Sequence, residues 1–286
     1  MAHSAEPADR IDDSAPAKPT PDRARRLLSV LRHAPTGFRA SRAFRRGRGA
    51  VARATVWGNE RLRLRLPVVV PDIKTHGLPR TGTNYFSALL EQNFKVRVLG
   101  GDAGGWKHGR IVPAPFTVYV VLVKNPYTWL LSFRAWEEIH GRTAAVTLYE
   151  FATSPVTHPR LAAEWHPTDP LGAWNTATRS WLEAATQPNV VVVRYEDLLA
   201  DFADHLSRVA ETCGAVPRRP TLTNLEERID TWNTPRPRAP FNPARYLDDG
   251  IPEEYDDEIL DLLARRLDSQ LVQALGYRLL ERVGQR

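Results

Sequence analysis

The chain has 286 residues, 42% of them hydrophobic, which suits one large globular domain or two small ones. Its formal net charge of +6 favours anionic ligands, and its only cysteine, Cys213, excludes a disulfide within the chain and favours a reducing compartment. No apolar run approaches the roughly 18 residues that a membrane span requires, and residues 1–13 are too polar and acidic for a secretory signal. We therefore expect a cytoplasmic protein.

The N-terminal region differs in composition from the rest of the chain. Residues 1–22 are rich in Ala, Pro, Asp and Ser, a composition typical of disorder. Residues 23–53 are rich in arginine, which is compatible with an arm that contacts a membrane surface or nucleic acid. A solvated basic tail is favoured, because only Phe38 and Phe44 are available there for base stacking. We expect this tail over 1–54, an ordered domain over 55–286, and no specific nucleic-acid partner.

Beyond the tail, runs typical of strands alternate with runs typical of helices. Phe116–Val123 is a continuous β-branched and aromatic run, which predicts a central parallel strand buried on both faces. We predict further strands over 64–74, 94–99 and 190–193, and helices over 85–92, 127–140, 171–185 and 195–213. Residues 252–280 are predicted to form one long amphipathic helix or a helix pair. This alternation predicts an α/β fold with a mostly parallel central sheet flanked by helices. Ligands of such sheets bind at the carboxyl ends of the strands.

The segment Gly77-Leu78-Pro79-Arg80-Thr81-Gly82-Thr83-Asn84, called the glycine loop here, lies between the first predicted strand and the first predicted helix. Glycines at this position let the backbone fold tightly around an anion, which the free amides of the new helix then face. Thr83 and Asn84 stand where a nucleotide triphosphatase has Lys and then Ser or Thr for phosphate and Mg²⁺. The loop therefore favours an anion other than Mg-ATP. The alternative is an ordinary strand-to-helix turn.

Other segments with polar residues follow the later predicted strands. Trp106-Lys107-His108-Gly109 lies in the loop after the second strand, and Lys124-Asn125-Pro126, with Ser132 beyond it, follows the central strand. Arg194-Tyr195-Glu196-Asp197 follows the strand at 190–193. In a parallel sheet these segments share one edge with the glycine loop.

Together these segments resemble the family of sulfotransferases that use 3′-phosphoadenosine 5′-phosphosulfate (PAPS). Residues 77–85 resemble its 5′-phosphosulfate loop, in which a Pro-Lys/Arg-x-Gly-Thr core precedes a helix. Lys124-Asn125-Pro126 with Ser132 resembles its 3′-phosphate motif, and residues 193–198 resemble its Tyr-Glu-Asp-Leu segment, whose tyrosine lies near the adenine. The resemblance spans 66–201. It implies a P-loop-like sulfotransferase fold, PAPS as sulfuryl donor, 3′-phosphoadenosine 5′-phosphate (PAP) as product, and no metal.

The resemblance also assigns cofactor-binding residues. It implies that the 5′-phosphosulfate is held by Arg80, Thr81, Gly82, Thr83 and Asn84, and the 3′-phosphate by Lys124 and Ser132, with Tyr195 near the base. Lys124 replaces the arginine usual in the family and loses its bidentate fork. The family's arginine-lysine-glycine loop is absent, so we expect the 3′-phosphate to contact one of its nearest substitutes, Arg236, Arg238 or Arg245.

For catalysis, the resemblance points to the segment after the second strand. Cytosolic members of the family carry a Lys-Thr-His run there, which implies His108 as general base and Lys107 as its electrostatic partner. The two roles can be swapped, because the intervening threonine is absent. Lys74-Thr75-His76 reproduces the tripeptide literally but precedes the glycine loop, so His76 ranks second. Glu137 and Glu138 are further alternatives, since some carbohydrate sulfotransferases use a glutamate.

We therefore expect an enzyme that transfers a sulfuryl group to a hydroxyl or amine acceptor, which can be a carbohydrate, a glycolipid or a small metabolite. A nucleotide-dependent phosphotransferase is the second hypothesis, and the missing Walker lysine counts against it. A basic nucleic-acid-binding or membrane-binding protein is the third, supported only by the tail. The tryptophans favour core packing. Trp136 with residues 143–170 could still form an acceptor cleft.

Overall fold

The computed structural model describes residues 70–114, 117–143, 147–225, 243–247 and 252–280. The predicted tail over 1–54 lies outside the described residues, and so do Arg236 and Arg238. Arg245 lies in the short helix α11 (Ala244–Leu247), but its side chain is outside the described part.

The described strands form a four-stranded parallel sheet in the order β3-β1-β4-β5. The strands are β1 (Asp72–His76), β3 (Arg97–Val98), β4 (Thr117–Val123) and β5 (Val190–Arg194). Every residue of β4 is buried, which confirms the prediction of a central strand covered on both faces. The registers pair His76 with Val121 and Val123 with Arg194, so the carboxyl ends of β1, β4 and β5 meet at one edge.

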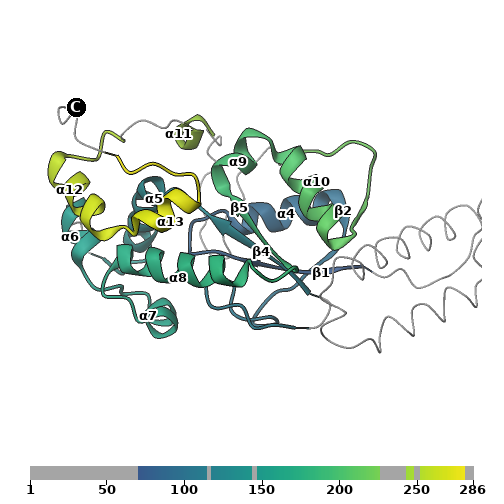
Figure 1. The fold of residues 1–286 in the computed structure, drawn as a ribbon, viewed down its shortest axis with the longest axis horizontal. Coiled ribbons are helices and arrows are strands. Elements are labelled where there is room, and N and C mark those ends of the chain that lie inside the picture. Colours follow the sequence, from purple (N-terminus) through teal and green to yellow (C-terminus); the bar gives the residue numbers. More distant parts are fainter. Residues whose placement is uncertain (1–69, 115–116, 144–146, 226–242, 248–251, 281–286) are drawn as a thin grey trace, which may run out of the picture.

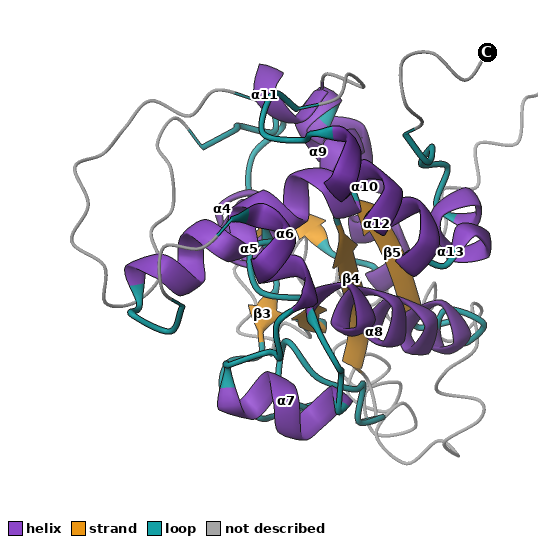
Figure 2. Ribbon diagram, turned by 90° about the vertical axis from the view of Figure 1, so that its left-hand side faces the viewer, coloured by secondary structure: helices purple, strands orange, loops and turns teal. Residues whose placement is uncertain are grey.

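Helices cover both faces of this sheet, which confirms the predicted α/β class (Figures 1 and 2). The even-numbered core residues of β4 (Val118, Val120, Leu122) pack with α4 (Thr83–Asn93), α9 (Tyr195–Ala200) and α10 (Phe202–Cys213). The odd-numbered residues (Tyr119, Val121, Val123) pack with the helices of the other layer, which are α5 (Pro126–Ile139), α6 (Leu148–Thr153), α7 (Pro159–Trp165), α8 (Pro170–Ala184), α12 (Asp257–Arg266) and α13 (Ser269–Ala274). This alternation follows from the period of two along a strand.

The first strand lies further along the chain than predicted. We expected it over 64–74, where the apolar run is strongest, but β1 begins at Asp72 and ends at His76, and residues 64–69 lie outside the described part. Lys74 and His76 are both buried in it. Lys74 Nζ donates to the Gly101 carbonyl at 2.7 Å, and His76 Nδ1 lies 3.1 Å from the Gly109 carbonyl. The position predicted for this strand from its local apolar content was therefore wrong.

Two other predicted elements are split in the structure. The segment 94–99 forms β2 (Phe94–Lys95), antiparallel to β6 (Val216–Pro217), and then β3, parallel to β1. The helix predicted over 195–213 breaks at Asp201, whose carboxylate caps α10 by accepting the Asp204 N–H at 3.0 Å. An aspartate at an N-cap favours such a break.

The C-terminal region forms the pair α12 and α13, in agreement with the predicted helix or helix pair. Arg266 of α12 pairs with Asp169, the N-cap of α8, and Asp268 pairs with Arg179 of α8. These ion pairs fasten the helix pair onto α8. In the described part of the chain, no helix is long and apolar enough to cross a membrane.

Candidate functional site

The glycine loop joins β1 to α4 through backbone conformations that favour glycine. Gly82 has φ +88°, and a Cβ built there would lie 2.5 Å from the Tyr195 ring. A Cβ at Gly77 (φ +154°) would lie 2.5 Å from the Leu122 carbonyl oxygen. Arg80 also adopts a positive φ of 72°. Both glycines are therefore required by close packing, and the loop is a built feature rather than an ordinary turn.

The first turn of α4 has the properties of an anion site. Its N-cap, Gly82, offers no side chain to the free backbone N–H groups, and the first turn contains no acidic residue. The positive end of the helix dipole is thus left open to an external anion. Lys107 Nζ donates to Asn84 Oδ1 at 2.8 Å, which brings an ammonium group to the same helix end. Burial lowers the pKa of Lys107.

Residues 106–109, called the histidine loop here, are bonded reciprocally to the end of β1. The Gly77 N–H donates to the Lys107 carbonyl at 2.9 Å. His108 Nδ1 lies 2.5 Å from the Gly77 carbonyl, and His76 Nδ1 lies 3.1 Å from the Gly109 carbonyl. His76 and His108 are far apart in sequence, but both lie where the end of β1 meets the histidine loop.

These contacts fix the protonation of both rings. A carbonyl can only accept, so Nδ1 of each histidine carries the proton and Nε2 of each keeps a lone pair. Burial, followed by the charge of Lys107, lowers the pKa of His108 to about 3. Burial lowers the pKa of His76 to about 4, against the opposing effect of the Gly109 carbonyl. Both imidazoles are neutral at physiological pH. His108 is half-buried, whereas His76 is fully buried.

Replacing His76 with asparagine is expected to flatten the pH dependence of stability between pH 6.5 and about 4. As pH falls below 6.5, the unfolded chain gains a proton that the folded protein does not take up, so folding loses about 3 kcal/mol by pH 4 through this group. The asparagine side chain would keep a nitrogen donor near Gly109 without titrating. The measurement is urea unfolding of both proteins across this range.

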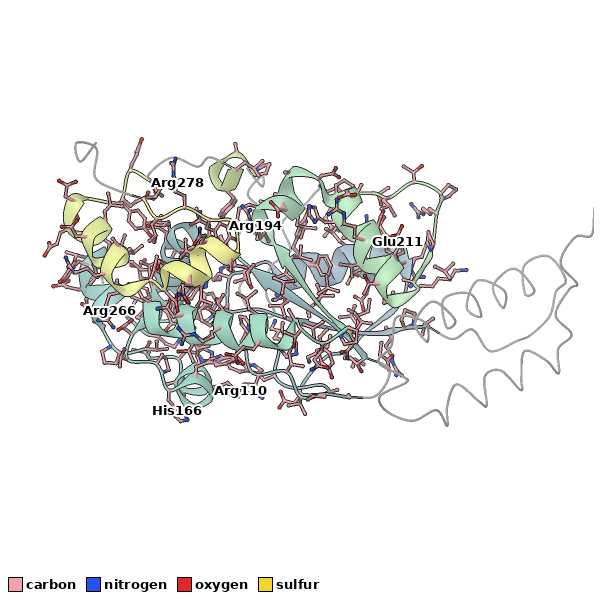
Figure 3. The ribbon with its side chains drawn as sticks, in the orientation of Figure 1. Arg110, His166, Arg194, Glu211, Arg266 and Arg278 are labelled. Carbon is pink, nitrogen blue, oxygen red and sulfur yellow. The ribbon has the colours of Figure 1, made fainter. Side chains whose placement is uncertain are left out.

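The control for this comparison is His166→Asn. His166 is the exposed C-cap of α7 with φ 46°, a conformation that asparagine tolerates, and its side chain points away from the ribbon (Figure 3). This variant should lose stability with acid as the unaltered protein does. An equally steep loss in His76→Asn would contradict the assignment of His76 as a buried neutral imidazole.

A second cation lies at the end of β4. Lys124 is 2% exposed, and its Nζ donates to Ser132 Oγ at 2.8 Å. Nζ also lies 5.3 Å from the centroid of the Tyr195 ring and 4.3 Å from that of Tyr246. The predicted pair Lys124 and Ser132 is thus brought together at the entry to α5 and on its second turn. A buried ammonium among a hydroxyl and two rings, with three N–H donors, is suited to binding an anion.

The Tyr195 ring connects the two regions. It packs against Gly82 on one side, lies near Lys124, and meets the Tyr246 ring edge-on at 5.4 Å. Burial raises the pKa of Tyr195, and the charge of Arg80 opposes this rise, so the guanidinium is also close. One aromatic residue therefore contacts both the glycine loop and the Lys124 site. Tyr246 of α11 was not predicted, since a single tyrosine beyond an irregular segment carries no local signal.

Glu196 anchors this edge of the sheet. Its Oε1 accepts the Asn125 N–H at 2.9 Å and its Oε2 accepts the Tyr277 hydroxyl at 2.8 Å. Burial raises the pKa of Glu196, against the opposing effect of these hydrogen bonds. The backbone at the Lys124 site is therefore connected through Glu196 to both α9 and the C-terminal segment.

Buried tryptophans hold the loops of the site from the core. Their indole N–H groups donate to backbone carbonyls as follows: Trp129 to Pro79 (2.9 Å), Trp165 to His108 (2.8 Å), Trp174 to Lys124 (3.1 Å) and Trp181 to Gly109 (3.1 Å). Each accepting carbonyl belongs to a segment predicted to carry function. The tryptophans are thus core residues, as expected, and they also position the site.

The glutamates considered as alternative bases are engaged elsewhere. Glu137 is buried, accepts a hydrogen bond from Arg142 Nε at 2.8 Å, and accepts another from the Thr157 hydroxyl at 2.6 Å. Glu138 pairs with Arg134 on the outer face of α5. Among the residues that the structure describes, no group of three His, Cys, Asp or Glu side chains is placed to hold a metal ion.

Comparison with known families gives one match in this region. A family model described as "Sulfotransferase domain" matches residues 115–234. This match supports membership of a sulfotransferase family. The match includes Lys124, Ser132 and Tyr195, whereas the glycine loop and the histidine loop precede it. Searches of the curated proteins and of the solved structures found no match.

The sulfotransferase match agrees with the architecture. A parallel four-stranded sheet flanked by helices, with the candidate residues at the carboxyl ends of its strands, is consistent with the sulfotransferase fold. The match supports a transferase whose general activity is sulfuryl transfer.

Proposed function

We propose that this sulfotransferase uses PAPS as donor and transfers its sulfuryl group to a hydroxyl or amine of the acceptor. The observation that carries the proposal is the pairing of two cation-bearing sites, the glycine loop with Lys107 and the Lys124–Ser132 pair, through the single ring of Tyr195. PAPS is a ligand with an anion at each end and an aromatic base, so one molecule accounts for all three features.

The residues present fit this donor. The glycines that no larger residue can replace, the uncapped N-terminus of α4 and Lys107 suit a 5′-phosphosulfate, which Arg80, Thr81, Gly82, Thr83 and Asn84 would hold. Lys124 and Ser132 would hold the 3′-phosphate. Tyr195, with Tyr246 beside it, offers a surface for the adenine. The expected contact of Arg236 or Arg238 with the 3′-phosphate stays a prediction, because both residues lie outside the described part of the chain.

His108 is proposed as the general base and Lys107 as its electrostatic partner. The Nε2 lone pair of His108 would take the proton of the acceptor hydroxyl while the acceptor oxygen bonds to sulfur and the bond from sulfur to the bridging oxygen breaks. Lys107 would stabilise the negative charge that develops on the leaving phosphate. A pKa of about 3 makes His108 a weak base in the free protein, but an anion beside Lys107 would raise it. His76, whose Nδ1 faces the same loop, ranks second.

Calorimetric titration with PAP, with ADP as the comparison ligand, tests the proposal. We expect PAP to bind more tightly than ADP, since only PAP carries a 3′-phosphate. Lys124→Met and Ser132→Ala should each weaken PAP binding by about 10- to 100-fold, the range for losing a charge-assisted hydrogen bond, with little effect on ADP.

Lys95→Ala is the matched control, because Lys95 lies on β2, in the second, two-stranded sheet. It should leave both affinities unchanged. Equal affinities for PAP and ADP in the unaltered protein would indicate a generic nucleotide site instead. Absence of binding by either ligand to the folded protein would refute PAPS as donor.

A further inference from the structure

A row of partly exposed rings extends from the histidine loop. The Trp106 ring meets His108 edge-on at 5.2 Å, and His158 stacks between Trp106 and Trp136 at centroid distances of 5.7 and 5.6 Å. We call Trp106, His158 and Trp136 the ring row. It joins the histidine loop to the N-terminus of α7 and to α5. The row begins at the proposed base, where an acceptor must lie.

Guanidinium groups lie over the two tryptophans of the ring row. Arg160 lies 4.7 Å from the Trp106 ring and Arg142 lies 4.2 Å from the Trp136 ring. Arg160 pairs with Asp102 at 2.6 Å, and both side chains of this pair are at least half exposed, so it is weak and exchangeable. Arg160 is thus a cation close to solvent, whereas Arg142 pairs with the buried Glu137 at 2.8 Å.

The hydrogen-bonding groups that the row leaves without a protein partner among the described residues are all donors. His158 Nδ1 accepts the Leu161 N–H at 3.0 Å, so the neutral ring carries its proton on Nε2. Arg142 Nη2 also has no acceptor within the described residues, but this atom is buried and therefore not exposed to a ligand in this structure. In contrast, both carboxylate oxygens of the buried Glu137 already receive hydrogen bonds.

The indole N–H groups of the row differ from those of the core tryptophans. The core indoles donate to backbone carbonyls of the site loops. Trp106 and Trp136 donate to no acceptor in the described part of the chain, and both are only partly buried. Because an unpaired donor costs little only where water or a ligand reaches it, these N–H groups are available to a ligand.

We propose that the ring row with Arg142 and Arg160 is the acceptor-binding surface, and that it takes an acidic oligosaccharide, rich in oxygen acceptors and bearing carboxylates. This inference depends on the proposed function, which puts the acceptor hydroxyl at His108. Donors without acceptors select a polyoxygenated ligand, and nearby guanidinium groups favour a negatively charged one. Neutral small metabolites match neither property.

The test uses the full chain saturated with PAP. It is titrated calorimetrically with a tetrasaccharide of alternating glucuronic acid and N-acetylglucosamine, and separately with the neutral tetrasaccharide of N-acetylglucosamine. We expect the acidic tetrasaccharide to bind at least about 10-fold more tightly. Arg160→Gln should remove most of this difference, and Trp136→Phe, which keeps a ring but removes the N–H, should weaken acidic binding by about 5-fold.

Arg179→Gln is the matched control, because Arg179 is also a half-exposed arginine paired with an aspartate, but it joins α8 to the start of α13. It should change neither saccharide affinity. Equal binding of the two saccharides, binding of neither, or an unchanged affinity in Arg160→Gln would overturn the inference. PAP binding is measured in every variant. Its retention separates a failure of the acceptor surface from a failure of PAPS as donor.

Discussion

His108→Asn is expected to lower kcat by about 100- to 10,000-fold, the usual contribution of a general base, for an acceptor that the unaltered protein sulfates. Asparagine can still offer an N–H to the Gly77 carbonyl, as His108 Nδ1 does, but it has no counterpart of the Nε2 lone pair. The loop should therefore keep its shape and PAP affinity should stay within about twofold, since the variant removes proton transfer alone. Single-turnover kinetics and PAP titration measure the two effects.

The same replacement at His166 serves as the control and should leave kcat unchanged, since that residue is exposed at the end of α7. If His108→Asn lowers kcat by less than about 10-fold, another residue is the general base, and His76 is the next candidate. The free protein's kcat/KM should show no acid limb from His108 between about pH 5 and 8, because its pKa of about 3 keeps it neutral throughout.

Gly82→Ala is expected to weaken PAP binding by about 30- to 1,000-fold. The new methyl group would lie 2.5 Å from the Tyr195 ring, and alanine at φ +88° is strained. The unbound loop would relax to another shape, and PAP binding would then have to reverse that relaxation. Overpacking and strain of this kind cost about 2–4 kcal/mol together, which corresponds to about 30- to 1,000-fold in affinity.

Gly101→Ala is the control that separates the effect of backbone strain from the effect of a steric clash. Gly101 also has a positive φ, +54°, but a Cβ there would have nothing within 4 Å. This control should lose some stability and keep its PAP affinity. Thermal unfolding of both variants, recorded beside the titrations, checks that Gly82→Ala remains folded. A folded Gly82→Ala protein with unaltered PAP affinity would contradict a nucleotide site that requires contact between the glycine loop and Tyr195.

Much of the fold was predictable because its strongest patterns are local. The apolar run of β4 and the helix after Asn125 are fixed by residues close in sequence. β1 was misplaced because its buried Lys74 and His76 depend on partners at Gly101 and Gly109, which are 27 and 33 residues away. No local pattern reports such partners.

The candidate site also combines features that the local sequence predicts with features that it does not. The glycine loop and the Lys124–Ser132 pair have motif spacing that the sequence displays. Tyr246 and the ring row are assembled from segments far apart in the chain, so only the tertiary structure reveals that Trp106 meets His158 or that Lys124 meets Tyr246. The reciprocal contacts of His76 and His108 likewise arise because the histidine loop packs against the end of β1, which their positions in sequence do not reveal.

The tyrosine contacts of the C-terminal segment affect when the site can form. Tyr277 reaches Glu196 across 81 residues, the Tyr255 hydroxyl reaches the Tyr127 carbonyl across 128, and the Leu280 N–H reaches the Tyr127 hydroxyl across 153. Closing such long loops costs entropy before any contact is gained, so these bonds form late in folding. We therefore expect the entry to α5 to stay incomplete during synthesis until residue 280 is free to fold, so that a nascent chain presents no finished Lys124 site.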